Sequence, residues 1–160
     1  MAEAVTHEEE RSGAEPKGPV VLNGEYRFKV DSKGRVSLPA KFRKVLSTQL
    51  VVARELENEC LYVFESPDFE EWINQLFISH FGKFEPSKRE HQRLLRKLKS
   101  LAMDVDVDKT GRIMLPAEAR EKVGIEKDVV ILGNTGRFEI WDAKRYDEDI
   151  EDIDLSVLYD

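Results

Sequence analysis

The alternation of apolar and polar residues predicts a half-buried strand near residue 26. In the segment YRFKV (26–30), apolar residues at every second position alternate with Arg27 and Lys29. A period of two sends alternate side chains to opposite faces of a β-strand. We therefore expect this strand to bury its apolar face and to expose its two basic residues.

Signals for a turn and a helix follow directly. In DSKGR (31–35), the Asp31 carboxylate can accept hydrogen bonds from nearby backbone N–H groups, and Gly34 can adopt a positive φ without steric cost. Pro39 suits the first turn of a short helix, PAKFRKVL. Further apolar runs predict two strands and then a longer helix, the strands lying near 50–54 and 60–64.

The same order of signals returns 77 positions later. The residues DKTGR (108–112) repeat DSKGR, and the agreement continues without a gap into the following helix, where PAEAREKV matches PAKFRKVL. Later segments correspond as well, because RFEIW at 137–141 falls on CLYVF at 60–64. Agreement in pattern over about 45 residues indicates a tandem duplication.

The chain divides into five segments on this basis. A helix between the repeats places several leucines on one face and basic residues on the rest. The basic face is either a second DNA-binding surface or an ordinary solvated face opposite the leucines. Acidic runs at both ends are expected to be solvated or disordered. The segments are an acidic extension (1–20), the first repeat (21–83), the basic connecting helix (84–101), the second repeat (102–146) and an acidic tail (147–160).

Composition narrows the class of protein. The net charge of −7 is unevenly spread, because basic residues concentrate at 24–45 and 86–100. No stretch approaches the ~20 apolar residues of a membrane span and no secretory signal is recognisable, so we expect a cytoplasmic protein without membrane contact. The single Cys60 and the spacing of the histidines predict neither a disulfide nor a metal site. No nucleophile motif or phosphate loop predicts an enzyme or a cofactor.

The doubled motif resembles the MraZ family of bacterial transcriptional regulators, which belongs to the AbrB-like swapped-hairpin class. The resemblance runs from about Asn23 to Tyr146 and rests on an aspartate, three residues and an arginine, twice, each followed by an apolar residue, a proline and a small residue. It implies an α+β fold of duplicated AbrB-like swapped-hairpin β-barrel units with short flanking helices, related by a pseudo-two-fold axis within one chain. Residues 1–20 have no counterpart, and Leu22 stands where the family usually has phenylalanine.

The resemblance also implies a function. It implies sequence-specific binding to repeated double-stranded DNA sites upstream of division and cell-wall genes, including the gene of the protein itself, a nucleoid-associated location and a ring-shaped homo-oligomer. The alternative function is that of an AbrB-like antitoxin or another protein-binding module. The double motif argues against this alternative, because such antitoxins usually carry one copy.

The tip of the first hairpin is the candidate DNA reader. A two-stranded ribbon fits the major groove, and arginine can bond guanine through two nitrogens. From the residues alone, the Asp31–Arg35 pair and the Asp108–Arg112 pair could equally well serve only to hold each hairpin together. With the resemblance, we expect Arg35 to read bases, and Lys33, Arg27, Lys29 and Arg43 to contact phosphates, with Arg112 as the second-repeat counterpart and with Asp31, Gly34, Asp108 and Gly111 as support.

The two copies differ in the charge of their first strand. Arg27 and Lys29 fall on Asp104 and Asp106, whereas the inward Tyr26 falls on Met103. Because phosphates repel an acidic strand, we expect the first repeat to hold DNA and the second to face away or to meet a neighbouring subunit. The other interpretation is that these aspartates form an ordinary solvated face.

Overall fold

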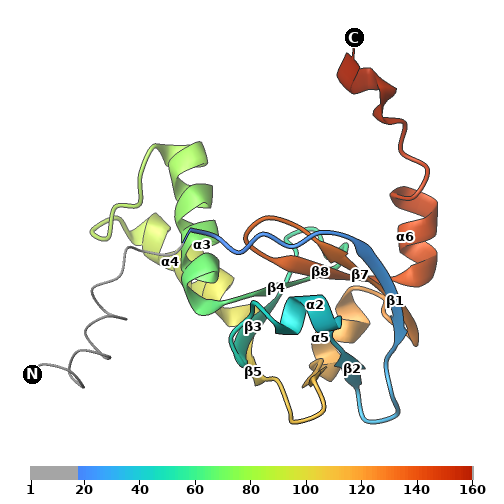
Figure 1. Ribbon diagram of the computed structural model, residues 1–160. Coiled ribbons are helices and arrows are strands. Elements are labelled where there is room, and N and C mark those ends of the chain that lie inside the picture. Colours follow the sequence, from blue (N-terminus) through green and yellow to red (C-terminus); the bar gives the residue numbers. More distant parts are fainter. Residues whose placement is uncertain (1–17, 160) are drawn as a thin grey trace, which may run out of the picture.

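The computed structural model describes residues 18–159 and shows a mixed α+β protein (Figure 1). A six-stranded antiparallel sheet has the order β1-β7-β8-β4-β3-β5, and β2 and β6 form a second, two-stranded sheet. The strands are Glu25–Lys29 (β1), Arg35–Ser37 (β2), Gln49–Arg54 (β3), Leu61–Phe64 (β4), Ala102–Asp106 (β5), Arg112–Met114 (β6), Asp128–Gly133 (β7) and Phe138–Asp142 (β8). The helices are Ala40–Arg43 (α2), Ser66–Phe81 (α3), Arg89–Ser100 (α4), Ala117–Lys122 (α5), Ala143–Asp149 (α6) and the short 3-10 helix Leu155–Tyr159 (η1).

The strands of the two halves of the chain interlock. β1 pairs with β7, β5 pairs with β3, and β2 pairs with β6, so each of these pairs joins one half to the other. β5 and β6 begin and end 77 positions after β1 and β2, which confirms the element order expected for the second half. Neither half could keep these ladder hydrogen bonds without the other.

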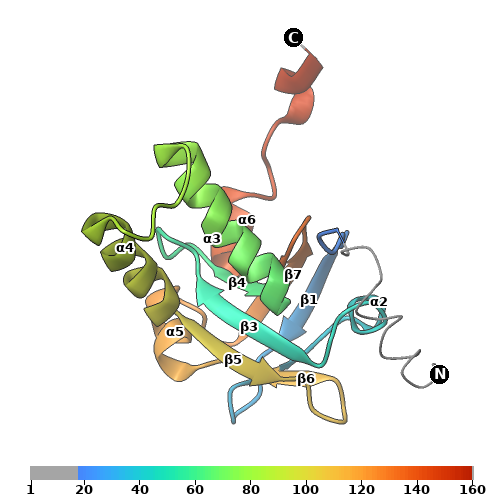
Figure 2. The ribbon, with the colours of Figure 1, turned by 90° about the vertical axis from the view of Figure 1, so that its left-hand side faces the viewer.

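Alternate side chains of the large sheet enter different apolar clusters. On β3, Val52 points into the central cluster, whereas Val51 packs with Phe64 and Phe69 against α3. The central cluster is closed by β2, β6 and residues of α2, of which Phe42 is almost fully buried. The other face is covered by α3 and α4 above β3 to β5 and by α6 above β7 and β8 (Figure 2).

Two expectations about the middle of the chain need correction. The connecting helix, expected at 84–101, begins only at Arg89, because α3 ends at Phe81, Gly82 follows with φ of 87°, and the chain then turns. Its leucine stripe is only partly buried: Leu95 and Leu98 pack into the cluster under α3, but Leu94 is 41% exposed. Met103, expected to point inward, is 53% exposed on the edge strand β5.

The two ends of the chain also differ from the expected pattern. Residues 1–17 of the predicted extension lie outside the described residues, but Val20, which was assigned to this extension, is buried in the central cluster. The predicted acidic tail starts inside α6, where Asp147 forms an ion pair with Arg27. Part of the predicted acidic tail is therefore helical and contacts the rest of the protein.

Candidate nucleic-acid interface

A tight turn joins β1 to β2. The Asp31 N–H donates to the Arg35 carbonyl oxygen (2.8 Å), and the Gly34 N–H donates to the Asp31 carbonyl oxygen (3.0 Å). Gly34 has φ of 88°, a conformation that residues with a Cβ rarely adopt. The glycine is therefore required by the shape of the turn.

The Asp31 carboxylate both fixes the turn and orients Arg35. Its Oδ1 accepts hydrogen bonds from the backbone N–H groups of Lys33 and Arg35, each at 2.9 Å. Its Oδ2 accepts from Arg35 Nε at 2.9 Å. The Arg35 backbone N–H is the main reason that the pKa of Asp31 lies below its ordinary value. Because the side-chain bond uses Nε, the two terminal nitrogens of Arg35 remain for another acceptor.

The turn between β5 and β6 has the same construction. Asp108 Oδ1 accepts from the backbone N–H groups of Thr110 and Arg112, each at 2.9 Å, and Gly111 has φ of 82°. Chiefly the Arg112 backbone N–H lowers the pKa of Asp108 to about 2. Arg112 Nη1 also lies 3.8 Å from Asp31 Oδ2, so the arginine of the second turn reaches the aspartate of the first.

Both turns lie at the same end of the molecule (Figures 1 and 2). The β2–β6 pairing joins them, and two reciprocal bonds extend it: the Leu38 N–H donates to the Gly111 carbonyl oxygen (2.9 Å) and the Leu115 N–H to the Gly34 carbonyl oxygen (2.8 Å). The turn of the second repeat therefore lies beside that of the first, which does not fit the expectation that the second repeat faces away from DNA held by the first. Sequence pattern could not show this, because the partner of a short strand is set by the tertiary fold.

The charge inversion between the copies stops before the turns. The first turn carries Lys33 and Arg35, and the second carries Lys109 and Arg112, so each presents one lysine and one arginine. The inverted positions lie on β1 and β5, which are the opposite edges of the six-stranded sheet. The joined end is consequently cationic on both turns.

Two further arginines lie over the turns, each against the turn of the other half. A Cβ on Gly111 would be 2.5 Å from Arg43 Nη1, and a Cβ on Gly34 would be 2.9 Å from Arg120 Nη2. Arg120 also donates through Nε to the Leu115 carbonyl oxygen (3.2 Å). Sequence reasoning missed Arg120 as a site residue, although its place 77 positions after Arg43 was a usable signal.

The two basic residues of β1 face carboxylates. Arg27 donates to Asp147 at 2.7 Å and lies 3.3 Å from Glu151, and the hydrogen bond with Asp147 is the main reason that its pKa is raised. Lys29 pairs with Asp128 across the β1–β7 ladder at 2.5 Å. Within residues 18–159, the charges of both candidates are therefore matched by carboxylates of other elements, and a role in phosphate contact remains a prediction for both.

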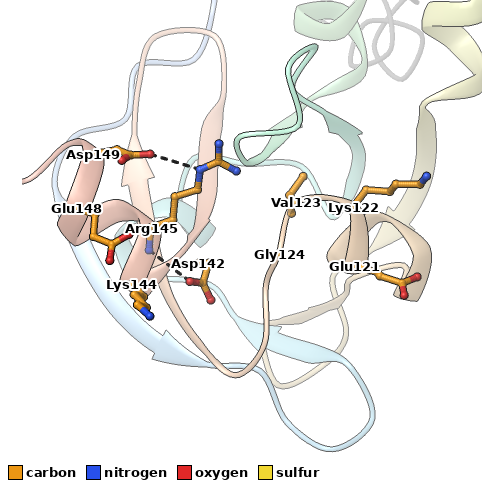
Figure 3. Close-up of a pocket in the computed structure, with 9 residues that line it drawn as sticks. All are labelled: Glu121, Lys122, Val123, Gly124, Asp142, Lys144, Arg145, Glu148 and Asp149. Atoms are coloured by element: carbon orange, nitrogen blue, oxygen red, sulfur yellow. Dashed lines mark hydrogen bonds and ion pairs between the residues drawn. The ribbon is translucent and has the colours of Figure 1, made fainter.

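Other features do not form a competing site. The cavity between α5 and α6 is lined by charges of both signs, and Arg145 there donates to Asp149 (3.4 Å) and to the Asn58 carbonyl oxygen (3.1 Å) (Figure 3). Burial raises the pKa of the Cys60 thiol, which disfavours the reactive thiolate. The part of the chain that the structure describes contains no acid, histidine and cysteine cluster that could hold a metal, and no helix long and apolar enough to cross a membrane.

The fold and site define a two-repeat α+β protein with a paired, arginine-bearing hairpin end. The pattern of the family described as "MraZ protein, putative antitoxin-like" matches residues 21–94 and 100–157. The chain belongs to the MraZ family, which confirms the resemblance seen in the doubled motif.

Relatives agree over most of their length, and each is named Transcriptional regulator MraZ. The protein of Thermoanaerobacter sp. (strain X514) is 36% identical over 136 residues, covering 85% of this chain and 91% of the relative. That of Caldanaerobacter subterraneus subsp. tengcongensis is 38% identical over 137 residues, with 85% and 91% covered. That of Natranaerobius thermophilus is 39% identical over 127 residues, with 78% and 82% covered. These names are those of regulators and not of enzymes.

Proposed function

We propose that the chain is a sequence-specific DNA-binding transcriptional regulator. The observation that carries the proposal is the joined end, at which two turns of the same construction present an oriented arginine each. The names of the relatives support the same class. A β-ribbon end of this kind suits the major groove, where arginine distinguishes guanine from other bases.

The finer parts of the proposal follow from the repeat and its pairing. We infer two swapped-hairpin units of common origin within one chain, supported by the 77-residue offset of the strands and by their pairing across the halves. The targets are repeated promoter sites upstream of division and cell-wall genes, including the protein's own, and the working form is a ring-shaped homo-oligomer at the nucleoid in the cytoplasm. Several joined ends in one assembly would engage several sites and raise apparent affinity.

The proposed role of each basic residue depends on the carboxylates that its side chain already contacts. Arg35 and Arg112 are proposed to read bases, because each is held through Nε by the aspartate of its own turn. Lys33 and Arg43 are exposed and are proposed to contact phosphates. Arg27 and Lys29, the two basic residues of β1, are proposed to contribute less, since carboxylates already bind them.

The test compares three single variants on DNA from the region upstream of the chain's own gene and on a scrambled duplex. Arg35→Ala should cost about 1–3 kcal/mol on the specific site and far less on the scrambled one. Lys33→Ala should weaken both duplexes alike and lower the salt slope by about one ion. Lys29→Ala is the matched control and should change little. Equal losses on both duplexes for Arg35→Ala would contradict base reading.

A protein-binding role is the second candidate, favoured by the family description with its antitoxin term. The two candidates predict different behaviour of the wild-type chain. A regulator binds its upstream DNA in preference to the scrambled duplex. Failure to bind either duplex at low salt would leave the protein-binding candidate standing instead.

A further inference from the structure

The helical hairpin formed by α3 and α4 carries an apolar groove on its outer side. Leu94 is 41% exposed there and Phe81 is 39% exposed, although the Phe81 ring packs against the buried His91 with ring centroids 4.4 Å apart. The groove adjoins the cluster that these helices bury against the sheet, because Phe77 and Leu98 belong to both. Its apolar lining is made by Leu56, Leu76, Phe77, Phe81, Leu94 and Leu98.

A second exposed apolar group lies at the C-terminal end of the described chain. The helix η1, with the sequence LSVLY, contains Leu155, Val157, Leu158 and Tyr159, which are between 64% and 91% exposed. It extends away from the body and from the α3–α4 hairpin in both views (Figures 1 and 2). Contiguous apolar groups that a chain leaves exposed commonly mark contact sites.

The helix α4 as a whole and the residues before η1 carry opposite net charges. The residues before η1, DEDIEDID at 147–154, are acidic and contain no lysine or arginine. On α4, Arg93 and Lys97 precede Leu94 and Leu98 by one position each, and within residues 18–159 neither has an ion pair. Glu90 and His80 also line the groove, so its own rim is not uniformly basic. Opposite charges of this kind favour encounter and fix the register of a contact.

We propose that the segment 154–159 of one copy binds in the α3–α4 groove of a second copy. Leucine, valine and tyrosine side chains of η1 fill the apolar groove, and the carboxylates of Asp152 and Asp154 lie along the basic side of α4. Groove and segment are different surfaces of the same chain, so the contact is head-to-tail and can be repeated from copy to copy. The inference rests on the self-association proposed above and does not depend on DNA binding.

The first experiment measures assembly of the full chain without DNA by sedimentation velocity over a concentration series. Leu94→Asp in the groove and Leu158→Asp in the segment should each raise the concentration of half-assembly at least tenfold, about 1.4 kcal/mol. Ile78→Asp is the matched control, because Ile78 is 40% exposed on α3 but does not line the groove. It should assemble as the wild type does. Unchanged assembly of both test variants would overturn the proposal.

A mixing experiment identifies the occupant of the groove. Leu94→Asp keeps an intact segment, and Leu158→Asp keeps an intact groove, so an equimolar mixture should form pairs but no longer assemblies. Binding of a segment within its own chain predicts no gain on mixing and would overturn the proposal. A labelled peptide of residues 147–160 should bind the Leu158→Asp chain, as measured by fluorescence anisotropy. It should bind the double variant, which carries both Leu158→Asp and Leu94→Asp, at least tenfold more weakly. A peptide that does not bind would assign the groove to a different protein.

The two proposals fail separately. Arg35→Ala should sediment as the wild type does, and Leu94→Asp should bind a duplex with one site as the wild type does. A wild-type chain that assembles but does not bind its upstream DNA contradicts the proposed regulator. A wild-type chain that binds a single site, with assembly unaffected by either apolar variant, contradicts the groove contact.

Discussion

The substitution Gly111→Ala tests whether the arginine of one half acts at the turn of the other. Gly111 has φ of 82°, where a Cβ costs about 1–2 kcal/mol through its contact with the following carbonyl. The added Cβ would also lie 2.5 Å from Arg43 Nη1. Because Arg43 is exposed and its side chain is flexible, its guanidinium should move before the backbone does. The folding cost is therefore that of the backbone, and the DNA-binding cost is that of the displaced cation.

Gly124→Ala is the matched control. Gly124 has φ of 76°, but a Cβ there meets no atom within 4 Å. Both variants should lose about 1–2 kcal/mol of folding free energy, which lowers Tm by about 2–4 °C per kcal/mol. Only Gly111→Ala should also weaken DNA binding in a salt series, with a slope smaller by about 0.9 for one lost phosphate contact. Wild-type DNA affinity and salt slope for Gly111→Ala would refute the role given to Arg43.

One further substitution, with its control, and one titration test the structure around the site. A Cβ on Gly133 would lie 2.5 Å from the Asn23 backbone nitrogen, so Gly133→Ala should displace the segment before β1, expose Leu22 and cost about 3–5 kcal/mol in urea unfolding. Gly18→Ala, with open space around it, should cost nothing measurable. The pKa of Asp108, lowered from 3.8 to about 2, predicts that its stabilising effect is complete above about pH 4 and is lost as the pH falls through about 2. An NMR titration of the Asp108 carboxyl carbon with a midpoint near 3.8 would contradict the hydrogen bonds assigned to this turn.

Local pattern was sufficient to predict the elements and the turns. Alternation in YRFKV located β1, and the glycine and aspartate of DSKGR predicted a turn in which the carboxylate accepts backbone N–H groups, as Asp31 does. These features depend on residues within about five positions of one another, and the repeat allowed them to be transferred to the second half.

Pairing over long sequence separations was not predictable in the same way. Alternation shows which face of β1 is apolar, but not that β7 lies beside it. The contact of Arg27 with Asp147 joins residues 120 positions apart, and the acidic run gave no sign of a specific partner. Met103 was misassigned because an edge strand can leave an apolar side chain uncovered.

A chain with a net negative charge can still bind DNA if some of its basic residues are paired with carboxylates and others are left for phosphates. Both kinds occur in this chain. Arg27 and Lys29 are matched by carboxylates, and their fields cancel at short range. Lys33, Arg43 and Lys109 are exposed and make no ion pair within the part of the chain that the structure describes. The first group stabilises contacts between the halves, and the second is free to neutralise phosphates.

The position of the acidic segment reinforces this division. In Figure 1 the C-terminal segment lies at the end of the molecule opposite to the two turns. Repulsion between its carboxylates and DNA bound at the turns is weakened over any distance beyond a Debye length of about 8 Å at physiological ionic strength. A charge distribution with a cationic end and an acidic end also favours approach to DNA with the turns foremost. The net charge of −7 therefore describes the tails more than it describes the surface that is proposed to bind DNA.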